Sequence, residues 1–331
     1  MEREESMISK RILLAAVTAI GLGSVTAGAA WAQAYPTRPI KIIVPFLAGG
    51  TVDIVARQIG QQLSALLGQP VVIDNRPGGG TTIALKAIAT SEPDGYTLLL
   101  GSTGSLTINP ILFKNIEFPG IRNLVPVGMI VTTTNLFAVR SALPVKSVDE
   151  LVAYAKSNPG KLNHGASLGV PPHLLGEFVR AKTGIDMPYV PYRSTAAAIP
   201  DFLSGQIQAT SESISVMLPH IQAGAARPLV VAGSKRLPEL PDVPTLVETG
   251  LSGFPDEVWM GLVAPGGTPA PIVERLNAAI NEGLKSPEAR AIFTKLGFQT
   301  QPGSAQEFVA RIAGDSDKWA AVIKLTGAKV D

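Results

Sequence analysis

Residues 40–57 restrict the fold of this chain more than any other segment. They join an apolar, β-branched run, two glycines at Gly49 and Gly50, and an acid, Asp53, that opens a helical pattern. This order predicts a strand, a tight turn and a helix N-terminus. Such a turn directs backbone N–H groups and the positive end of a helix dipole at one small volume. An anion or a carboxylate could bind there without any lysine or arginine.

The same succession of strand, glycine turn and helix recurs, which predicts an α/β fold with parallel strands. Turns that follow parallel strands open at the carboxyl edge of a sheet, where ligands of α/β folds bind. Two such edges facing one another would form a cleft. The glycine turns lie at residues 48–50, 78–80, 101–104 and 165–169. The predicted strands span residues 40–45, 71–75, 97–101, 127–132, 135–139, 162–167, 208–211, 229–232 and 258–264.

The length of the chain predicts two domains, because 331 residues, 46% of them hydrophobic, exceed the usual size of one core. We expect the chain to cross between two lobes near residues 132–135 and to return near residues 254–259. The first lobe would then comprise residues 35–133 and 258–331, and the second residues 134–257.

Helix start signals support this organisation. Capping boxes occur at Ser147 with Glu150 and at Ser304 with Glu307, and Thr268 is expected to cap a helix that has proline in its first turn. The helix over residues 52–67 has one apolar stripe, which should pack on a sheet. The stripe consists of Val52, Val55, Ile59, Leu63 and Leu66.

The first 32 residues have the pattern of a secretory signal peptide. Lys10 and Arg11 precede an apolar run, and residues 30–32, Ala-Trp-Ala, have the form of a signal-peptidase site. Cleavage after Ala32 would place the protein in the periplasm, with Met7 as the expected start. An uncleaved membrane anchor is the alternative, since the run is nearly long enough to span a bilayer.

Composition excludes several classes of protein. The chain has no cysteine, so it forms no disulfide and carries no lipid on an N-terminal cysteine. Its 28 basic and 26 acidic residues are nearly balanced and form no basic run. This balance argues against a nucleic-acid partner.

Catalytic signals are weak. Residues 165–169, Gly-Ala-Ser-Leu-Gly, match the nucleophile elbow of serine hydrolases, which leaves a secreted hydrolase centred on Ser167 as an alternative. In an elbow the helix begins directly after the serine, whereas we expect Val170, Pro171 and Pro172 to delay the helix until about His173.

Metal and cofactor signals are also weak. The three histidines, His164, His173 and His220, lack metal-ligand spacing, and no phosphate or dinucleotide fingerprint is complete. We therefore expect no metal site and no cofactor. His173 either lines a cleft or is a capping or half-buried histidine, and Asp53 either stabilises its helix dipole or orients a ligand.

Nine short motifs occur in a fixed order: Tyr35-Pro-Thr-Arg-Pro-Ile, Val44-Pro-Phe-Leu-Ala-Gly-Gly-Thr-Val-Asp53, Asn75-Arg-Pro-Gly, Pro93-Asp-Gly-Tyr-Thr-Leu, Asn109-Pro, His173-Leu-Leu-Gly-Glu177, Val190-Pro-Tyr-Arg, Leu218-Pro-His-Ile and Ala264-Pro-Gly-Gly-Thr-Pro-Ala-Pro. With these motifs, residues 35–329 resemble the periplasmic solute-binding receptors of tripartite tricarboxylate transporters, the Bug receptors. The resemblance implies a receptor without enzymatic activity, whose two α/β lobes are joined by two crossing strands and close on a small carboxylated solute. It also implies delivery of that solute to membrane permease subunits, and we expect a monomer.

The resemblance further implies which residues line the site. In the first lobe these are Phe46, Ala48, Gly49 and Asp53, with Ser102 and Thr103 in the next turn. In the second lobe they are Ser167, Gly169 and His173, with Tyr192, Glu212 and Ser213 as further lining residues; the strand near Trp259 is a weaker candidate. This chain departs from the family pattern at Val170 and Pro171 and at Glu212-Ser213, so we expect either an unusual selectivity of the second lobe or a less polar pocket. A periplasmic sensor of the same fold, acting on a signalling kinase, is the alternative function.

Overall fold

The strand, turn and helix that begin at Ile40 form as the sequence predicts. Strand β1 (Ile40–Val44) is followed by an exposed turn and by α2 (Thr51–Leu67), which ends at Gly68 in the left-handed conformation. The predicted stripe of α2 is buried except for Leu66, which is 38% exposed, while Leu67 is buried in its place.

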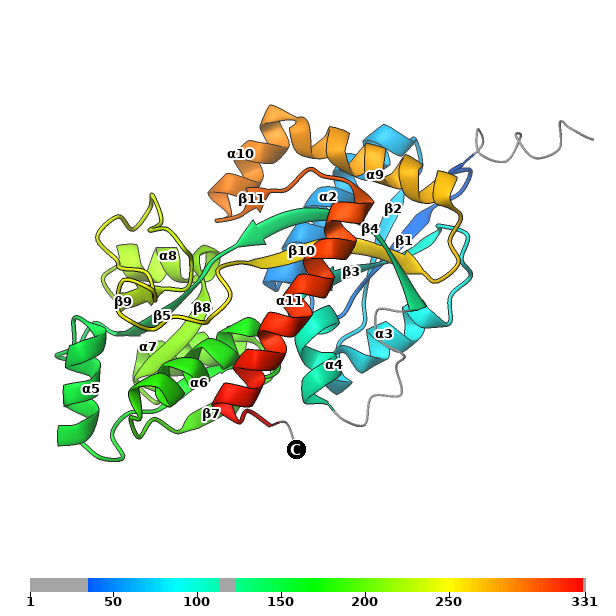
Figure 1. Ribbon diagram of the computed structural model, residues 1–331. Coiled ribbons are helices and arrows are strands. Elements are labelled where there is room, and N and C mark those ends of the chain that lie inside the picture. Colours follow the sequence, from blue (N-terminus) through cyan, green and yellow to red (C-terminus); the bar gives the residue numbers. More distant parts are fainter. Residues whose placement is uncertain (1–34, 114–122, 330–331) are drawn as a thin grey trace, which may run out of the picture. The chain divides into compact units, whose positions relative to one another are not determined.

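The computed structural model describes residues 35–113 and 123–329, and the residues from Arg38 onward form one compact unit (Figure 1). The signal peptide predicted at residues 1–32, and the choice of Met7 as the start, lie outside the described residues. Among the helices within the described ranges, none has the length and apolar character needed to cross a bilayer.

Two sheets organise the fold. The first lobe contains a six-stranded sheet of order β11-β4-β10-β3-β1-β2, and the second a five-stranded sheet of order β7-β6-β8-β5-β9. The further strands are β2 (Val71–Asn75), β3 (Thr97–Ser102), β4 (Leu124–Thr133), β5 (Asn135–Arg140), β6 (His164–Ser167), β7 (Tyr189–Tyr192), β8 (Ala209–Ser213), β9 (Ala226–Val231), β10 (Val258–Pro265) and β11 (Gln299–Thr300). The further helices are α3 (Thr82–Ala89), α4 (Asn109–Leu112), α5 (Val148–Ser157), α6 (Pro171–Thr183), α7 (Thr195–Ser204), α8 (Ile214–Gln222), α9 (Ala270–Lys285), α10 (Pro287–Lys295) and α11 (Ala305–Thr326), with short turns η1 (Gly79–Thr81) and η2 (Gly104–Ile108).

The expectation of parallel strands is confirmed for three strands of each sheet, and the crossing strands make both sheets mixed. Strands β1, β2 and β3 are parallel to one another, as are β6, β7 and β8. Strand β10 is antiparallel to β3 and β4, and β5 is antiparallel to β8 and β9. The antiparallel strands are those that carry the chain between lobes: β4 leads directly into β5, and β10 returns to the first sheet. A crossing strand enters from the other lobe, so it need not run parallel to its new neighbours.

All nine predicted strands are present, and two were not predicted. Strand β7 contains Pro191, and proline lacks the N–H needed in a central strand. It is tolerated because β7 lies at the edge of its sheet. Strand β11 has two residues, too few for a periodic signal.

Helix caps agree with the sequence in two of three places. Ser304 and Glu307 form the complete capping box of α11, and the Ser147 hydroxyl accepts from the Glu150 N–H at the start of α5. The Thr268 prediction is wrong, because α9 begins at Ala270 and the Thr268 hydroxyl instead donates to the Pro265 carbonyl at 2.8 Å.

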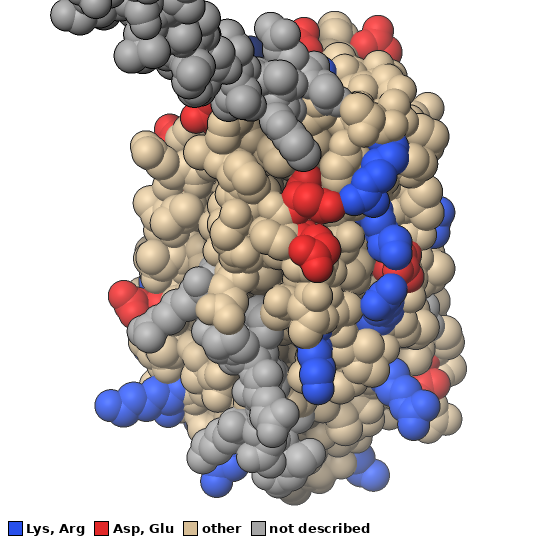
Figure 2. All heavy atoms as spheres, turned by 90° about the vertical axis from the view of Figure 1, so that its right-hand side faces the viewer, with Lys and Arg blue, Asp and Glu red and all other residues tan. Residues whose placement is uncertain are grey.

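Helix α11 contributes to the hydrophobic cores of both lobes (red in Figure 1). Phe308 and Ile312 lie in a buried cluster with Trp259 and Leu99 of the first sheet. Trp319 and Val322, two to three turns later, lie in a second buried cluster, most of whose residues belong to the second lobe. On the face shown in Figure 2, several basic side chains follow one another along one side, with acidic side chains beside them.

Candidate functional site

The candidate site lies where the parallel strands of both sheets end. In the first lobe, β1 and β3 are neighbours and their turns follow Val44 and Ser102. In the second lobe, β6 and β8 are neighbours and end at Ser167 and Ser213. The crossing strands lie at the same edges, because Ser102 pairs with Met260 of β10 and Ser213 pairs with Asn135 of β5.

The turn after β1 is held by Asp53. The Gly49 N–H donates to Asp53 Oδ2 at 2.8 Å, and Arg57 Nε donates to the same oxygen at 2.9 Å. Asn75 Nδ2 donates to Asp53 Oδ1 at 3.0 Å and to the Phe46 carbonyl at 3.1 Å. The first turn of α2 has no side-chain cap, and Ala48 and Gly49 are exposed. Asp53 therefore shapes the turn instead of presenting a free carboxylate.

The charge state of Asp53 follows from these contacts. Burial raises the pKa of the Asp53 carboxyl, but the hydrogen bonds from Arg57, Gly49 and Asn75 and the charge of Arg57 outweigh burial and lower it below its usual value. A lowered carboxyl pKa means that its stabilising contribution is present at neutral pH and is lost as pH falls through the folded-state pKa.

We expect Asp53→Asn to lower the free energy of unfolding by about 2 kcal/mol, because the new NH₂ group faces the donors on Gly49 and Arg57. Urea unfolding at pH 7 measures the change. Asp74→Asn is the matched control: Asp74 pairs with Arg76 on a partly exposed surface, where an ion pair contributes less than about 1 kcal/mol. Equal effects of the two substitutions would contradict the role given to Asp53.

Side chains in the turn after β3 bond within the fold. The Ser102 N–H donates to Ser105 Oγ at 2.9 Å. Thr103 Oγ1 accepts from the Trp259 N–H at 2.9 Å and donates to the Trp259 carbonyl at 3.4 Å. Ser102 and Thr103 are both buried. Thr103 thus ties this turn to the returning strand β10.

The turns of the two lobes touch at Gly104. A Cβ atom on Gly104 would lie 3.5 Å from the Gly169 carbonyl oxygen and 3.5 Å from a methyl group of Val170. Gly169 has φ +74°, a conformation that favours glycine, and a Cβ there would lie 2.9 Å from Asn109 Oδ1. The predicted second-lobe turn therefore faces the first lobe.

Helix α6 begins at Pro171, which corrects the expected delay until His173. The two prolines occupy the first turn of the helix, where their missing N–H groups would have no partner in any case. Because α6 begins so soon after Ser167, the turn is closer to the nucleophile elbow of a serine hydrolase than the sequence suggested. Among the described residues, however, no hydrogen bond joins the Ser167 hydroxyl to an imidazole, as a hydrolase would need. His164 Nε2 is instead 3.0 Å from Ser211 Oγ.

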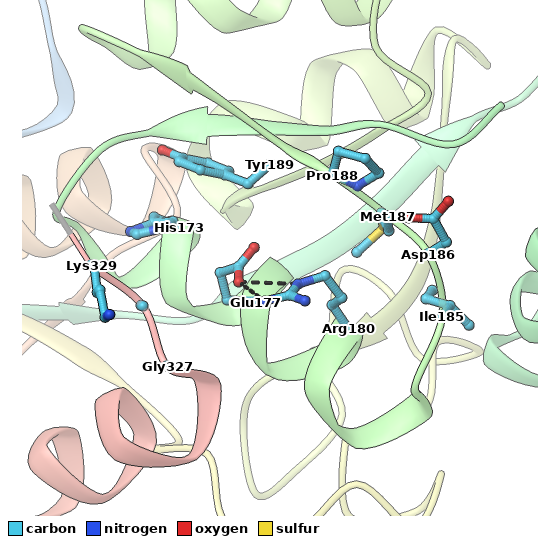
Figure 3. Close-up of a pocket in the computed structure, with 11 residues that line it drawn as sticks. His173, Glu177, Arg180, Ile185, Asp186, Met187, Pro188, Tyr189, Gly327 and Lys329 are labelled. Carbon is cyan, nitrogen blue, oxygen red and sulfur yellow. Dashed lines mark hydrogen bonds and ion pairs between the residues drawn. The ribbon is translucent and has the colours of Figure 1, made fainter. Parts of the chain in front are cut away.

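His173 lines a cavity of about 410 Å³ between α6, residues 185–189 and the end of the described chain (Figure 3). It is 2% exposed and stacks on Tyr189 with ring centroids 4.2 Å apart. The Glu177–Arg180 ion pair lines the middle of this cavity, and residues 327–329 close one side. Burial lowers the pKa of His173 to about 4, so its imidazole is neutral at pH 7. None of the other predicted site residues lines the cavity.

The remaining second-lobe candidates, Tyr192, Glu212 and Ser213, are buried or already hydrogen-bonded within the fold to different degrees. The Tyr192 hydroxyl donates to Asp201 at 2.7 Å, and burial together with that aspartate raises the Tyr192 pKa to about 12. Its ring packs over Gly165, so Tyr192 supports α7. Glu212 and Ser213 are buried at the end of β8, where the Ser213 hydroxyl bonds to Ser215 Oγ at 2.7 Å.

Asn109 was missed as a site residue, although Asn109-Pro is among the nine motifs. Its Nδ2 donates to the Gly80 carbonyl at 2.9 Å and to Thr81 Oγ1 at 3.2 Å. Its Oδ1 is buried beside Gly169 without a hydrogen-bond partner among the described residues. The signal in the sequence was an asparagine directly before proline, close to a glycine turn.

No group of three or more histidine or acidic side chains within the part of the chain that the structure describes could hold a metal ion. The site consists of turns at facing sheet edges. Two lobes joined by crossing strands, with such turns between them, define a solute-binding protein of the periplasmic type.

Residues 55–328 match the model of the tripartite tricarboxylate transporter family receptor, and the chain belongs to this family. Protein BugT of Bordetella pertussis is 36% identical over 316 residues, which cover 94% of this chain and 97% of BugT. The structure of R. palustris Rpa4515 with adipate has a TM-score of 0.83 and 34% identity, covering 89% of this chain and 100% of that one. The structure of MatC from Rhodopseudomonas palustris with bound malate has a TM-score of 0.80 and 31% identity, covering 87% of this chain and 100% of MatC. The family and these neighbours are solute-binding receptors, so the chain is not an enzyme.

Proposed function

We propose that this protein captures a small carboxylate between its lobes in the periplasm and delivers it to the membrane permease subunits of a tripartite tricarboxylate-type transporter. The observation that carries the proposal is the contact between the Gly104 turn of the first lobe and the Gly169 turn of the second. Turns at facing carboxyl edges supply backbone donors to an anion, and similar proteins have been solved with adipate and with malate.

Ligand contacts would come from backbone groups at 46–49, from Ser102, and from Ser167, Gly169 and Ser213. The hydroxyls of Thr103 and Tyr192 would act indirectly, since both are bonded within the fold. The buried Asn109 Oδ1 needs a donor, from water or from the solute, because an unpaired buried acceptor costs about 1–3 kcal/mol. Pro171 and Pro172 provide no N–H, so a carboxylate at this turn would rely on Gly169 and Ser167.

We further propose that residues 35–133 and 258–331 move as one lobe against residues 134–257, that the signal peptide is removed after Ala32, and that the receptor acts as a monomer. Binding would shift the lobes toward a closed state that the permease recognises.

A thermal-shift screen over mono-, di- and tricarboxylates, including adipate and malate, tests the function. At a concentration 100 times its Kd, a bound carboxylate stabilises the native state by about 2.7 kcal/mol, which raises the Tm of a chain of this length by roughly 4 °C. The matched control is the diamide of each diacid at equal ionic strength, which has the same length without the charge. Failure of every carboxylate, or an equal shift with the diamides, would contradict the proposal.

A further inference from the structure

Trp259 joins the turn after β3 to the last helix of the chain. Its backbone N–H and carbonyl both bond to the Thr103 hydroxyl, at 2.9 and 3.4 Å. Its indole Nε1 donates to Asp315 Oδ2 at 2.9 Å. The indole is 1% exposed and meets Phe308 edge-on, with ring centroids 5.1 Å apart. A continuous set of hydrogen bonds therefore runs from Thr103 through Trp259 to α11.

Asp315 is the buried centre of this set. It is 1% exposed, and its Oδ2 also accepts from Arg311 Nε at 2.7 Å, while Oδ1 accepts from Lys318 Nζ at 3.3 Å. Arg311 extends in turn to Glu257, just before β10, with 3.8 Å between Nη1 and the carboxylate. Two cations compensate the buried carboxylate and hold it at one position on α11.

Asp315 lies on α11 between the residues that pack in the two hydrophobic clusters. On one side, Ile312 packs in the core of the first lobe; on the other, Trp319 packs in the core of the second. Asp315 therefore lies on the stretch of α11 that connects the two clusters, where a movement of one lobe relative to the other would act on the helix. Packed helices transmit such movement because their contacts adopt discrete arrangements.

We propose that Asp315 and Trp259 are positioning residues for the solute site, which couple the 102–104 turn to α11 and through it to the second lobe. This inference rests on the proposed function, in which the 102–104 turn is part of the solute site. Both residues are buried, each 1% exposed, and would act on the solute through the turn. Asp315 orients the indole, the indole fixes β10 at Trp259, and the Trp259 backbone fixes the Thr103 hydroxyl.

Hydrogen exchange without any added solute tests the coupling. Trp259→Phe keeps the edge-on ring contact but removes the indole N–H, and we expect about tenfold faster exchange in residues 102–108. Trp319→Phe is the matched control, because Trp319 Nε1 is buried with no partner and its loss breaks no hydrogen bond. Unchanged exchange in residues 102–108 of Trp259→Phe, or an equal change in Trp319→Phe, would overturn the proposal.

A double-mutant cycle distinguishes coupling between Thr103 and Trp259 from two independent local destabilisations. Thr103→Val removes the hydroxyl with little change in volume, so its effect on exchange in residues 104–108 should be non-additive with that of Trp259→Phe. Additive effects would refute a connected network. Calorimetry with adipate and malate forms the second arm, in which Trp259→Phe should weaken binding about tenfold. If neither acid binds the wild-type protein while the exchange results hold, the proposed function for these acids fails and the coupling stands.

Discussion

Replacing Gly176 by alanine is expected to lower the free energy of unfolding by about 3 kcal/mol, near the upper end of the usual cost of overpacking a core. A Cβ at Gly176 would overlap the imidazole ring of His164. His164 is fully buried and cannot retreat, because its ring stacks on Phe137 at 5.8 Å and its Nε2 bonds to Ser211 at 3.0 Å. Helix α6 would have to move away from the sheet.

Urea unfolding measures this change, and α11 supplies a matched control. Gly314 is also a helical glycine, but nothing lies within 4 Å of the place its Cβ would take. Gly314→Ala should raise the free energy of unfolding by about 0.5–1 kcal/mol. With His164→Ala in the background, Gly176→Ala should lose most of its cost, because the overlapping ring is gone. If Gly176→Ala still destabilised the protein by about 3 kcal/mol in this background, the overlap with His164 would not be the cause.

Lowering the pH from 7 to 5 is expected to reduce the free energy of unfolding by about 4 kcal/mol through two histidines. Burial lowers the pKa of His164 to about 3, with a further contribution from His173, and burial lowers the pKa of His173 to about 4. Below pH 6.5 the unfolded chain binds protons that the folded protein does not, so stability falls as pH falls. Each histidine contributes about 1.4 kcal/mol per pH unit, or about 2 kcal/mol at pH 5.

Urea titrations at pH 7, 6 and 5 test the pH dependence, and His173→Phe isolates one of the two groups. Phenylalanine keeps the stacking on Tyr189 but cannot titrate, so the loss between pH 7 and 5 should fall to about 2 kcal/mol. Since the Asp53 pKa is lowered, Asp53 titrates below this window and does not obscure it. A wild-type stability that stays constant from pH 7 to 5 would show that both imidazoles are accessible to protons in the native state.

Nine of the eleven strands in the described residues could be predicted, because most of them are short runs rich in apolar or β-branched residues with a turn signal nearby. Periodicity does not report strand direction, which is why the antiparallel pairing of β5 and β10 was not foreseen. These strands pair with neighbours brought from distant parts of the chain. The start of α6 at Pro171 was missed for a local reason: proline breaks a helix interior but suits a first turn.

For the candidate site, the sequence predicted the positions of the backbone turns but not the contacts of the side chains. Glycine turns after strands marked the two facing edges, and Gly104 and Gly169 do meet. The side chains could not be assigned from sequence, because neither a distant partner nor a nearby one without a motif leaves a signal. The Thr103 hydroxyl bonds to Trp259, which lies 156 positions later. Tyr192 bonds to Asp201 in the next helix, which no motif indicated.

The sharing of α11 by two cores has a consequence for how the protein folds. Each lobe would otherwise be able to complete its core as soon as its own strands were made, and domains commonly fold in this way, N-terminal first. Here Phe308 and Ile312 complete one core, and Trp319 and Val322 the other, after all other helices and strands of the described chain. These two clusters therefore remain incomplete until the same late helix docks, although a further second-lobe cluster around Phe202 and Met217 does not involve α11. We expect the parts of the two lobes that share α11 to gain and lose their structure together, in one cooperative transition.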